Sequence, residues 1–390
     1  MRLLGSWRCA VLAAAVSVSA FGITAPPSNA ATAGAVISVI PQPEGWRGMP
    51  GGSVVEYWMA GSDGTPQPAS GAVLLPEGAP PPGGWPIIAY DHGSFGLGRG
   101  CGGQADFASG PWPERRVHED RFLRTFLSKG FAVVAPDYLG LGRFDTGPHP
   151  YLELKTEATA TIDLVKAARA SHPQLSRTWA LLGGSQGGQA ALGTAYLQRT
   201  YAPDLDFRGT IAIDPASEAE NLLPMAGPWG PDLPSVIGDG LTMVVASVLV
   251  GMRAARPEVN VDSYLTPRGR EVLDSISVLC QDKILERVQG VGISDILSKP
   301  LTDEHFRAVI ADYMGVPTSG YNAPILLLLN ATDIAVPAPL HAALVARFAA
   351  NHVDHKVVVG TGLHLQINQA MGAAIDAFLT RIKSSKTSVN

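Results

Sequence analysis

The sequence is poor in cysteine and in charge. Only three of its 390 residues are cysteines, and charged residues make up 16% of the chain. No cysteine or histidine cluster has zinc-site spacing, and no glycine-rich loop has the pattern of a phosphate cradle, so we expect no metal and no organic cofactor. The formal net charge of −5 argues against nucleic acid as a partner. Hydrophobic residues make up 46%, enough to bury a large core.

The N-terminal segment has the order of a secretory signal peptide. Arg2 and Arg8 form a positive region, residues 9–20 are apolar or small, and residues 28–30 suit a cleavage site. A short anchor helix is the alternative, but the apolar run is below the roughly 20 residues that span a bilayer. We therefore expect residues 1–30 to be removed and the protein to be secreted, without a transmembrane span.

Export would leave two cysteines in the mature chain, because Cys9 lies in the signal peptide. An even pair in an oxidising compartment predicts one disulfide, between Cys101 and Cys280. Two buried free thiols, which pack as small hydrophobic residues, are the alternative.

Short apolar segments alternate with helical ones along most of the chain. The expected buried strands are 85–90, 131–135, 179–182, 209–213, 324–329 and 356–359, and the expected helices are 114–129, 157–170, 189–200, 340–351 and 367–383. This alternation predicts a mainly parallel, doubly wound α/β sheet with helices on both faces. Residues 53–57 and 71–75 are expected to add an antiparallel hairpin before it.

Residues 222–318 lack this alternation, and a structureless loop of that length is implausible. We expect an inserted helical cap or lid, with helices near 241–251 and 271–288. The α/β domain then consists of residues 31–221 and 319–390. We expect the apolar helix at 241–251 to line a ligand pocket above the carboxyl edge of the sheet. Packing of the cap onto the sheet is the alternative role for this helix.

The strongest functional signal is a glycine-rich pentapeptide around Ser185, with the sequence Gly-Gly-Ser-Gln-Gly. It follows an apolar strand and opens a helix, the context in which G-x-S-x-G predicts a nucleophile elbow. The turn is tight, so the residues two before and two after the serine must be small, and both are glycine. Ser185 is therefore the candidate nucleophile, and an incidental serine in a glycine-rich turn is the alternative.

A serine hydroxyl needs a base, and the base needs an orienting acid. In the α/β-hydrolase fold the chain order is Ser, Asp or Glu, then His, each in a loop after a strand. Asp333 follows the strand at 324–329, and capping of the next helix is its alternative role. His364 is the only histidine after the last strand, whereas His341 lies on a helix. We expect a triad of Ser185, Asp333 and His364.

Acyl transfer also needs donors for the developing oxyanion. The backbone N–H of Gln186, directly after the nucleophile, is the first candidate. The second is the backbone N–H of Ser94, in a His-Gly loop after a buried strand, with Phe95 as the alternative. We expect His92 to shape this loop and take no part in catalysis.

A Tyr-x-Gly-x-Gly block at 138–142 and a His-Pro-Tyr block at 149–151 form an unusual combination. Together with the serine motif, the His-Gly loop and the insertion, they resemble the secretory lipase family, which includes secreted fungal lipases and related actinobacterial enzymes. The resemblance runs from about residue 54 to the C-terminus.

The resemblance implies an α/β-hydrolase fold with an inserted cap, and a triad of Ser185, Asp333 and His364. It implies a disulfide between the loop after the oxyanion strand and the insertion, where Cys101 and Cys280 stand. It also implies lipid or other ester substrates, acylglycerols above all, and transient contact with a lipid interface. Fungal members often carry another C-terminal disulfide, for which this chain has no cysteines.

We therefore expect a secreted ester hydrolase, a lipase that acts through an acyl-enzyme. An acyltransferase or a peptidase with the same triad is one alternative. A secreted binding protein that kept the fold and lost catalysis is the other.

Overall fold

The computed structural model describes residues 31–45, 47–106, 113–229 and 235–384. The expected signal peptide, residues 1–30, lies outside the described residues. In the part of the chain that is described, nine strands form one mixed sheet, and helices cover both of its faces.

The sheet has the strand order β1-β2-β3-β5-β4-β6-β7-β8-β9. The strands are β1 (Val36–Gln42), β2 (Gly52–Ala60), β3 (Pro66–Leu74), β4 (Trp85–Asp91), β5 (Ala132–Pro136), β6 (Leu175–Gly184), β7 (Asp206–Ile213), β8 (Ile325–Asn330) and β9 (His355–Gly360). Strands β1 to β3 pair antiparallel with each other and with β5, and all other pairs are parallel. The predicted strands are confirmed, but β1 was not predicted from its sequence.

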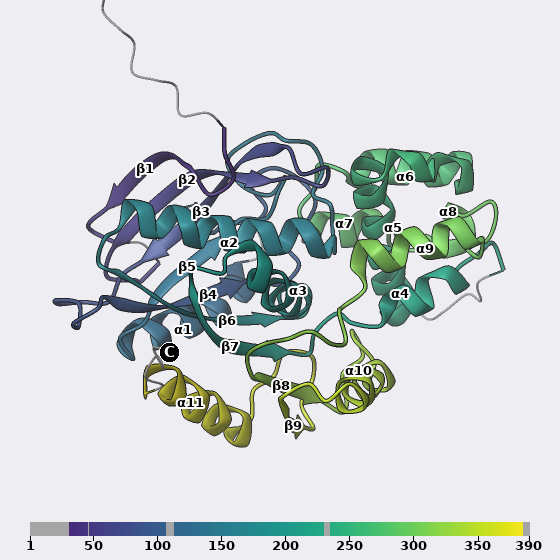
Figure 1. Cartoon of the computed structure of the whole chain (residues 1–390). Coiled ribbons are helices and arrows are strands. Elements are labelled where there is room, and N and C mark those ends of the chain that lie inside the picture. Colours follow the sequence, from purple (N-terminus) through teal and green to yellow (C-terminus); the bar gives the residue numbers. More distant parts are fainter. Residues whose placement is uncertain (1–30, 46, 107–112, 230–234, 385–390) are drawn as a thin grey trace, which may run out of the picture. The chain divides into compact units, whose positions relative to one another are not determined.

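Helices pack on the sheet, as Figure 1 shows. They are α1 (Pro113–Ser128), α2 (Leu154–Ser171), α3 (Gln186–Tyr201), α10 (Ala338–Ala350) and α11 (Gln369–Ser384). Successive side chains of a strand point to opposite faces. In β4, Ile87 packs with the core under α2 and α3, whereas Ile88 packs with the core under α1 and α11. Burial on both faces explains the continuous apolar runs of the central strands.

The insertion is helical, as expected, and its buried side chains form one hydrophobic cluster with Leu97, Tyr151 and Leu152 of the α/β domain. The short helix α4 (Ala219–Leu222) leads into the insertion, which contains η1 (Leu223–Met225), α5 (Ser235–Ala255), η2 (Pro257–Val259), η3 (Val261–Tyr264), α6 (Pro267–Ile276), α7 (Gln281–Arg287), α8 (Ile293–Ile296) and α9 (Glu304–Met314). The prediction of a single helix at 271–288 is wrong, because this segment contains the end of α6 and a separate helix α7. The helix is interrupted between α6 and α7. Leu279 N–H donates to Ile276 O in the turn, and Cys280 is the N-cap residue of α7.

Helix α5 is long and apolar enough to cross a membrane between Ile237 and Ala255, by length and composition alone. Half of that stretch is buried inside the structure. Val245 and Val248, at 3% and 1% exposure, lie in the core of the cap. This face of α5 therefore packs within the cap.

Candidate active site

Ser185 stands on the turn between β6 and α3, at the carboxyl edge of the sheet. Its backbone has φ 58° and ψ −123°, a conformation that non-glycine residues rarely adopt. The turn is held from β7, because Ser185 N–H donates to Ile213 O at 2.9 Å. Neighbouring structure therefore enforces the strained serine backbone that the sequence motif predicts.

The glycines on either side of Ser185 are required by close backbone approach. A Cβ atom added to Gly183 would lie 2.0 Å from Gly187 O, and one added to Gly187 would lie 1.9 Å from Asp91 O. Each distance is far below a van der Waals contact. The two small residues of the motif therefore allow β6, α3 and the end of β4 to meet under the serine.

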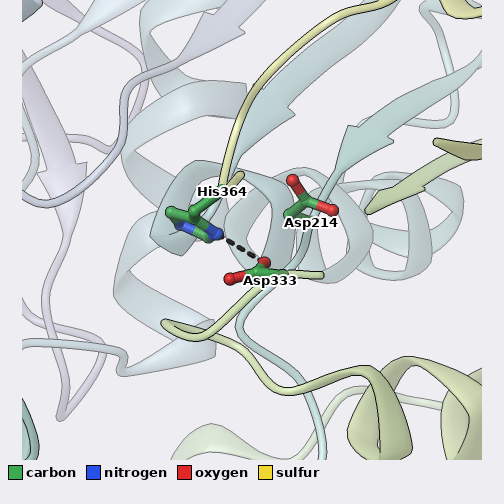
Figure 2. A group of neighbouring side chains, drawn as sticks. All are labelled: Asp214, Asp333 and His364. Carbon is green, nitrogen blue, oxygen red and sulfur yellow. Dashed lines mark hydrogen bonds and ion pairs between the residues drawn. The ribbon is translucent and has the colours of Figure 1, made fainter. Parts of the chain in front are cut away.

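Asp333 and His364 lie in the loops after β8 and β9, and Figure 2 shows them facing each other. His364 Nδ1 lies 2.6 Å from Asp333 Oδ2. The other carboxylate oxygen, Oδ1, accepts N–H bonds from Ala335 at 2.8 Å and Val336 at 3.0 Å. A carboxylate bonded to Nδ1 leaves Nε2 of the imidazole for the reacting groups.

The pKa of Asp333 lies well below its usual value. Burial of the carboxyl acts in the opposite direction, but hydrogen bonds from His341 and His364, the charge of His364 and the Val336 N–H outweigh it. Asp333 therefore stays ionised at neutral pH, as an acid that stabilises an imidazolium must.

Two neighbours of this pair were missed in the sequence. Asp214, directly after β7, accepts hydrogen bonds from Asn330 N–H, Asn330 Nδ2 and Leu365 N–H at 2.7–2.8 Å. His341, set aside because it lies on a helix, places Nε2 3.5 Å from Asp333 Oδ2 and 3.6 Å from Asp214 Oδ1. The position of Asp214 directly after an apolar strand could have identified it as a site residue. No sequence pattern marks His341, because only folding brings α10 to this edge of the sheet.

Asp214, Asp333 and His364 offer ligand atoms that all lie within 4.8 Å of one another (Figure 2). Such a cluster resembles a metal site by composition. Here, however, backbone and amide N–H groups occupy both oxygens of Asp214 and one oxygen of Asp333. The arrangement suits an oriented imidazole and its acid better than a cation.

The expected oxyanion donors lie beside the elbow. Gln186 is the first residue of α3 and is buried, and Ser94 is buried in the loop after β4. A Cβ atom added to Gly187 would lie 2.7 Å from His92 O, so the loop of Ser94 lies against the elbow. His92 is also buried, and its Nδ1 is 2.7 Å from Gly93 O.

The loop of the histidine also reaches the elbow. A Cβ atom added to Gly184 would lie 2.8 Å from Leu365 Cδ2, so the residue before Ser185 lies next to the residue after His364. Within the described ranges, the Ser185 hydroxyl makes no hydrogen bond to His364. Nucleophile–base bonds are often loose without substrate, so the proximity is the useful observation.

Two cavities adjoin these residues. One has a volume of about 1090 Å³ and is lined by α1, the carboxyl ends of β4, β6 and β7, and the loop of His364. The other measures only about 10 Å³ and lies between Ser94 and Tyr151 on one side and Met243 and Ser247 of α5 on the other. Met243 and Ser247 of α5 therefore line this small space, whereas the buried valines do not.

The cap is tied to the loop of Ser94 by a covalent bond and by backbone pairing. Cys101 and Cys280, 179 residues apart, form a disulfide. Beside it, Leu97 N–H donates to Leu279 O at 2.9 Å, and Gln281 N–H donates to Phe95 O at 2.8 Å. The disulfide expected from the cysteine count and the resemblance is present.

Solved structures with a similar fold include a lipase and an esterase. Candida antarctica lipase A aligns with a TM-score of 0.74 and 16% identity, over 92% of this chain and 84% of that one. The rice cell wall degrading esterase LipA from Xanthomonas oryzae aligns with a TM-score of 0.67 and 19% identity, over 90% and 96%. A putative hydrolase from Legionella pneumophila aligns with a TM-score of 0.62 and 19% identity, over 87% and 90%. The predicted α/β-hydrolase fold is thus confirmed.

A comparison with curated protein sequences gave no significant match. The model of the secretory lipase family, in contrast, matches residues 116–292, from α1 across the elbow and into the cap. The expected resemblance is therefore confirmed, and over this region the chain has the sequence pattern of the secretory lipase family.

Proposed function

We propose that this protein is a secreted serine carboxylic ester hydrolase, a lipase or esterase with Ser185, Asp333 and His364 as its triad. The observation that carries the proposal is the 2.6 Å bond between His364 and Asp333 at the sheet edge where Ser185 is held in a strained turn. The match to the secretory lipase family supports the reaction class. The family name, the disulfide and the N-terminal sequence support secretion.

In the proposed reaction, Ser185 Oγ attacks the ester carbonyl while His364 Nε2 takes its proton. Asp333 holds the imidazole and stabilises its charged form. The backbone N–H groups of Gln186 and Ser94 bind the developing oxyanion. His364 then protonates the leaving alcohol, and water repeats the sequence on the acyl-enzyme.

We propose different places for the two halves of the ester. The cleft of about 1090 Å³ contains His364, which must reach the leaving oxygen, so the alcohol half occupies this cleft. The acyl half points to the cap, where the space beside Ser94 is only about 10 Å³. That space holds about one water molecule, so the cap in this position favours short acyl groups. In this proposal the α/β domain, residues 31–221 and 319–390, contains the catalytic residues, and the cap, residues 222–318, borders the site of the acyl group.

The test is the turnover of p-nitrophenyl butyrate by the wild type, Ser185→Ala and Ser171→Ala. Ser171, at the end of α2, controls for the loss of a serine hydroxyl far from the elbow. We expect Ser185→Ala to lower kcat by about 10⁴-fold or more and Ser171→Ala to keep it. A Ser185→Ala protein that retains more than roughly a tenth of wild-type turnover would show the nucleophile to be misassigned.

The same assay separates the alternatives. An acyltransferase would pass the butyryl group to added ethanol in preference to water. A peptidase would also cleave peptide p-nitroanilides, which an ester hydrolase leaves intact. A wild-type protein inactive on every acyl substrate would favour a binding protein on this fold.

A further inference from the structure

The Tyr-x-Gly-x-Gly and His-Pro-Tyr blocks stand outside the triad, yet the fold places them against both proposed oxyanion donors. We propose that residues 138–151, together with Glu157, form a brace that positions the N–H groups of Ser94 and Gln186. The proposal rests on the ester hydrolase function proposed above. Tyr138 and His149 are positioning residues in this scheme, because they act through the donors. Tyr151 acts through Ser94 in the same way, although it also lines the small space on the acyl side.

The brace holds the loop of Ser94 at three points. Tyr138 OH donates to His92 O at 3.0 Å, and His149 N–H donates to Leu97 O at 2.8 Å. Between them, Tyr151 OH and Ser94 Oγ share a hydrogen bond of 2.8 Å. The loop is thus held before, at and after the residue whose backbone N–H would bind the oxyanion.

The brace also holds the elbow, through the side chain of Gln186. Gln186 Nε2 donates to His149 Nε2 at 2.7 Å and to Glu157 Oε1 at 2.6 Å. His149 Nδ1 lies 2.9 Å from Leu139 O, so Nδ1 carries the proton and Nε2 is free to accept. One histidine therefore connects the loop of Ser94, through its backbone, to the elbow, through its ring.

The charges of the brace fit this arrangement. Burial lowers the pKa of His149 to about 4, so its ring is neutral at pH 7. Burial raises the pKa of Glu157 well above its usual value, against the opposing hydrogen bond from Gln186. His149, Glu157 and Gln186 are all at most 1% exposed. Because water does not reach these groups, a lost hydrogen bond would not be replaced by one to water. Each hydrogen bond of the brace therefore fixes the position of the side chain that donates it.

Oxyanion donors work only within a narrow range, about 2.7–3.1 Å from the developing charge. Ser94 and Gln186 are 92 positions apart in sequence, Ser94 in the loop after β4 and Gln186 at the start of α3. A shared anchor on residues 138–151 keeps the two N–H groups at a constant separation. This explains why two sequence blocks without a triad residue accompany the serine motif.

The first test compares Tyr151→Phe with Tyr57→Phe. Both tyrosines are buried, and each loses one hydrogen bond of 2.8 Å, but Tyr57 OH donates to Ala160 O, away from the donors. We measure kcat and KM for p-nitrophenyl butyrate and the Ki of an alkyl trifluoromethyl ketone, whose adduct carries an oxyanion. We expect Tyr151→Phe to lower kcat and raise Ki by about tenfold each, less than the 10²–10³ for a removed donor, with KM unchanged. Tyr57→Phe should keep all three values.

Ser94→Ala removes the same bond from the other side and keeps the backbone N–H. We expect it to match Tyr151→Phe, and the double variant to lose no more than either single one. Wild-type kcat and Ki in both single variants, or equal losses in Tyr151→Phe and Tyr57→Phe, would overturn the brace. Failure of the proposed function is a separate result, since the wild-type protein would then not hydrolyse the ester.

The elbow side of the brace is tested at Glu157. Glu157→Gln keeps a carbonyl acceptor for Gln186, whereas Glu157→Leu keeps the size and removes the acceptor. We expect the glutamine variant to retain kcat and Ki, and the leucine variant to lose about tenfold in each. Equal values in the two variants would show that the bond to Gln186 does not position the donor.

Discussion

Asp91 permits a quantitative test of the packing beneath the elbow. Its side chain is fully buried at the end of β4, and Gly187 of the elbow packs on its carbonyl oxygen. Burial raises the pKa of the Asp91 carboxyl to about 8, although the hydroxyl of Thr161 donates to Oδ1 at 2.6 Å and acts in the opposite direction. The folded protein therefore carries a neutral Asp91 at pH 7.

The sign of the stability effect follows from proton linkage. An unfolded aspartate has a pKa of about 3.9, so the native state binds the extra proton between about pH 4 and pH 8. The stabilisation that Asp91 contributes is complete below pH 4 and is lost as the pH rises through 8. From pH 7 to pH 9, a native pKa of about 8 predicts a loss of about 1.4 kcal/mol in the free energy of unfolding.

The perturbation is Asp91→Asn, which keeps the Oδ1 acceptor for Thr161 and does not titrate. We measure urea unfolding of the wild type, Asp91→Asn and the exposed control Asp354→Asn at pH 7 and pH 9. Asp91→Asn should lose about 1.4 kcal/mol less than the wild type over this interval, and Asp354→Asn should follow the wild type. Equal pH dependence in the wild type and Asp91→Asn would refute a protonated Asp91.

The remaining predictions concern the site and its two cavities. Asp333→Asn should lower kcat by about 10⁴-fold with little change in KM, because the amide favours the wrong imidazole tautomer; a nearly silent variant would mean that another carboxylate orients the base. Met243→Ala should enlarge the space beside the cap and raise the ratio of octanoate to acetate hydrolysis by about tenfold. Met252→Ala, in the cap core, should leave the ratio unchanged, and equal shifts in both variants would contradict the assignment. Thr125→Trp should slow the hydrolysis of butyrates of bulky alcohols more than that of ethyl butyrate. Ser128→Trp, on the same helix but outside the cleft, should slow neither reaction, and equal effects of Thr125→Trp on both esters would place the alcohol half elsewhere.

The features that could be predicted from the sequence depend on neighbouring residues. Strands β4, β5 and β8 are nearly continuous apolar runs because both of their faces are buried, and such runs are visible without a structure. The turn at Ser185 needs small residues two positions away on each side, so its motif is local too. Asp333 and His364 could be chosen as candidates because each follows a strand, and parallel strands present their carboxyl ends at one edge.

Other features depend on contacts between distant segments, which no local pattern reports. His341 adjoins Asp333 only because α10 packs along the sheet, and Val245 faces the cap core because the orientation of α5 depends on its partners. The connection from His149 to Gln186 joins two motifs that could be recognised separately. Hydrophobic periodicity determines which segments form strands and helices, whereas side-chain packing and long-range hydrogen bonds determine which residues meet.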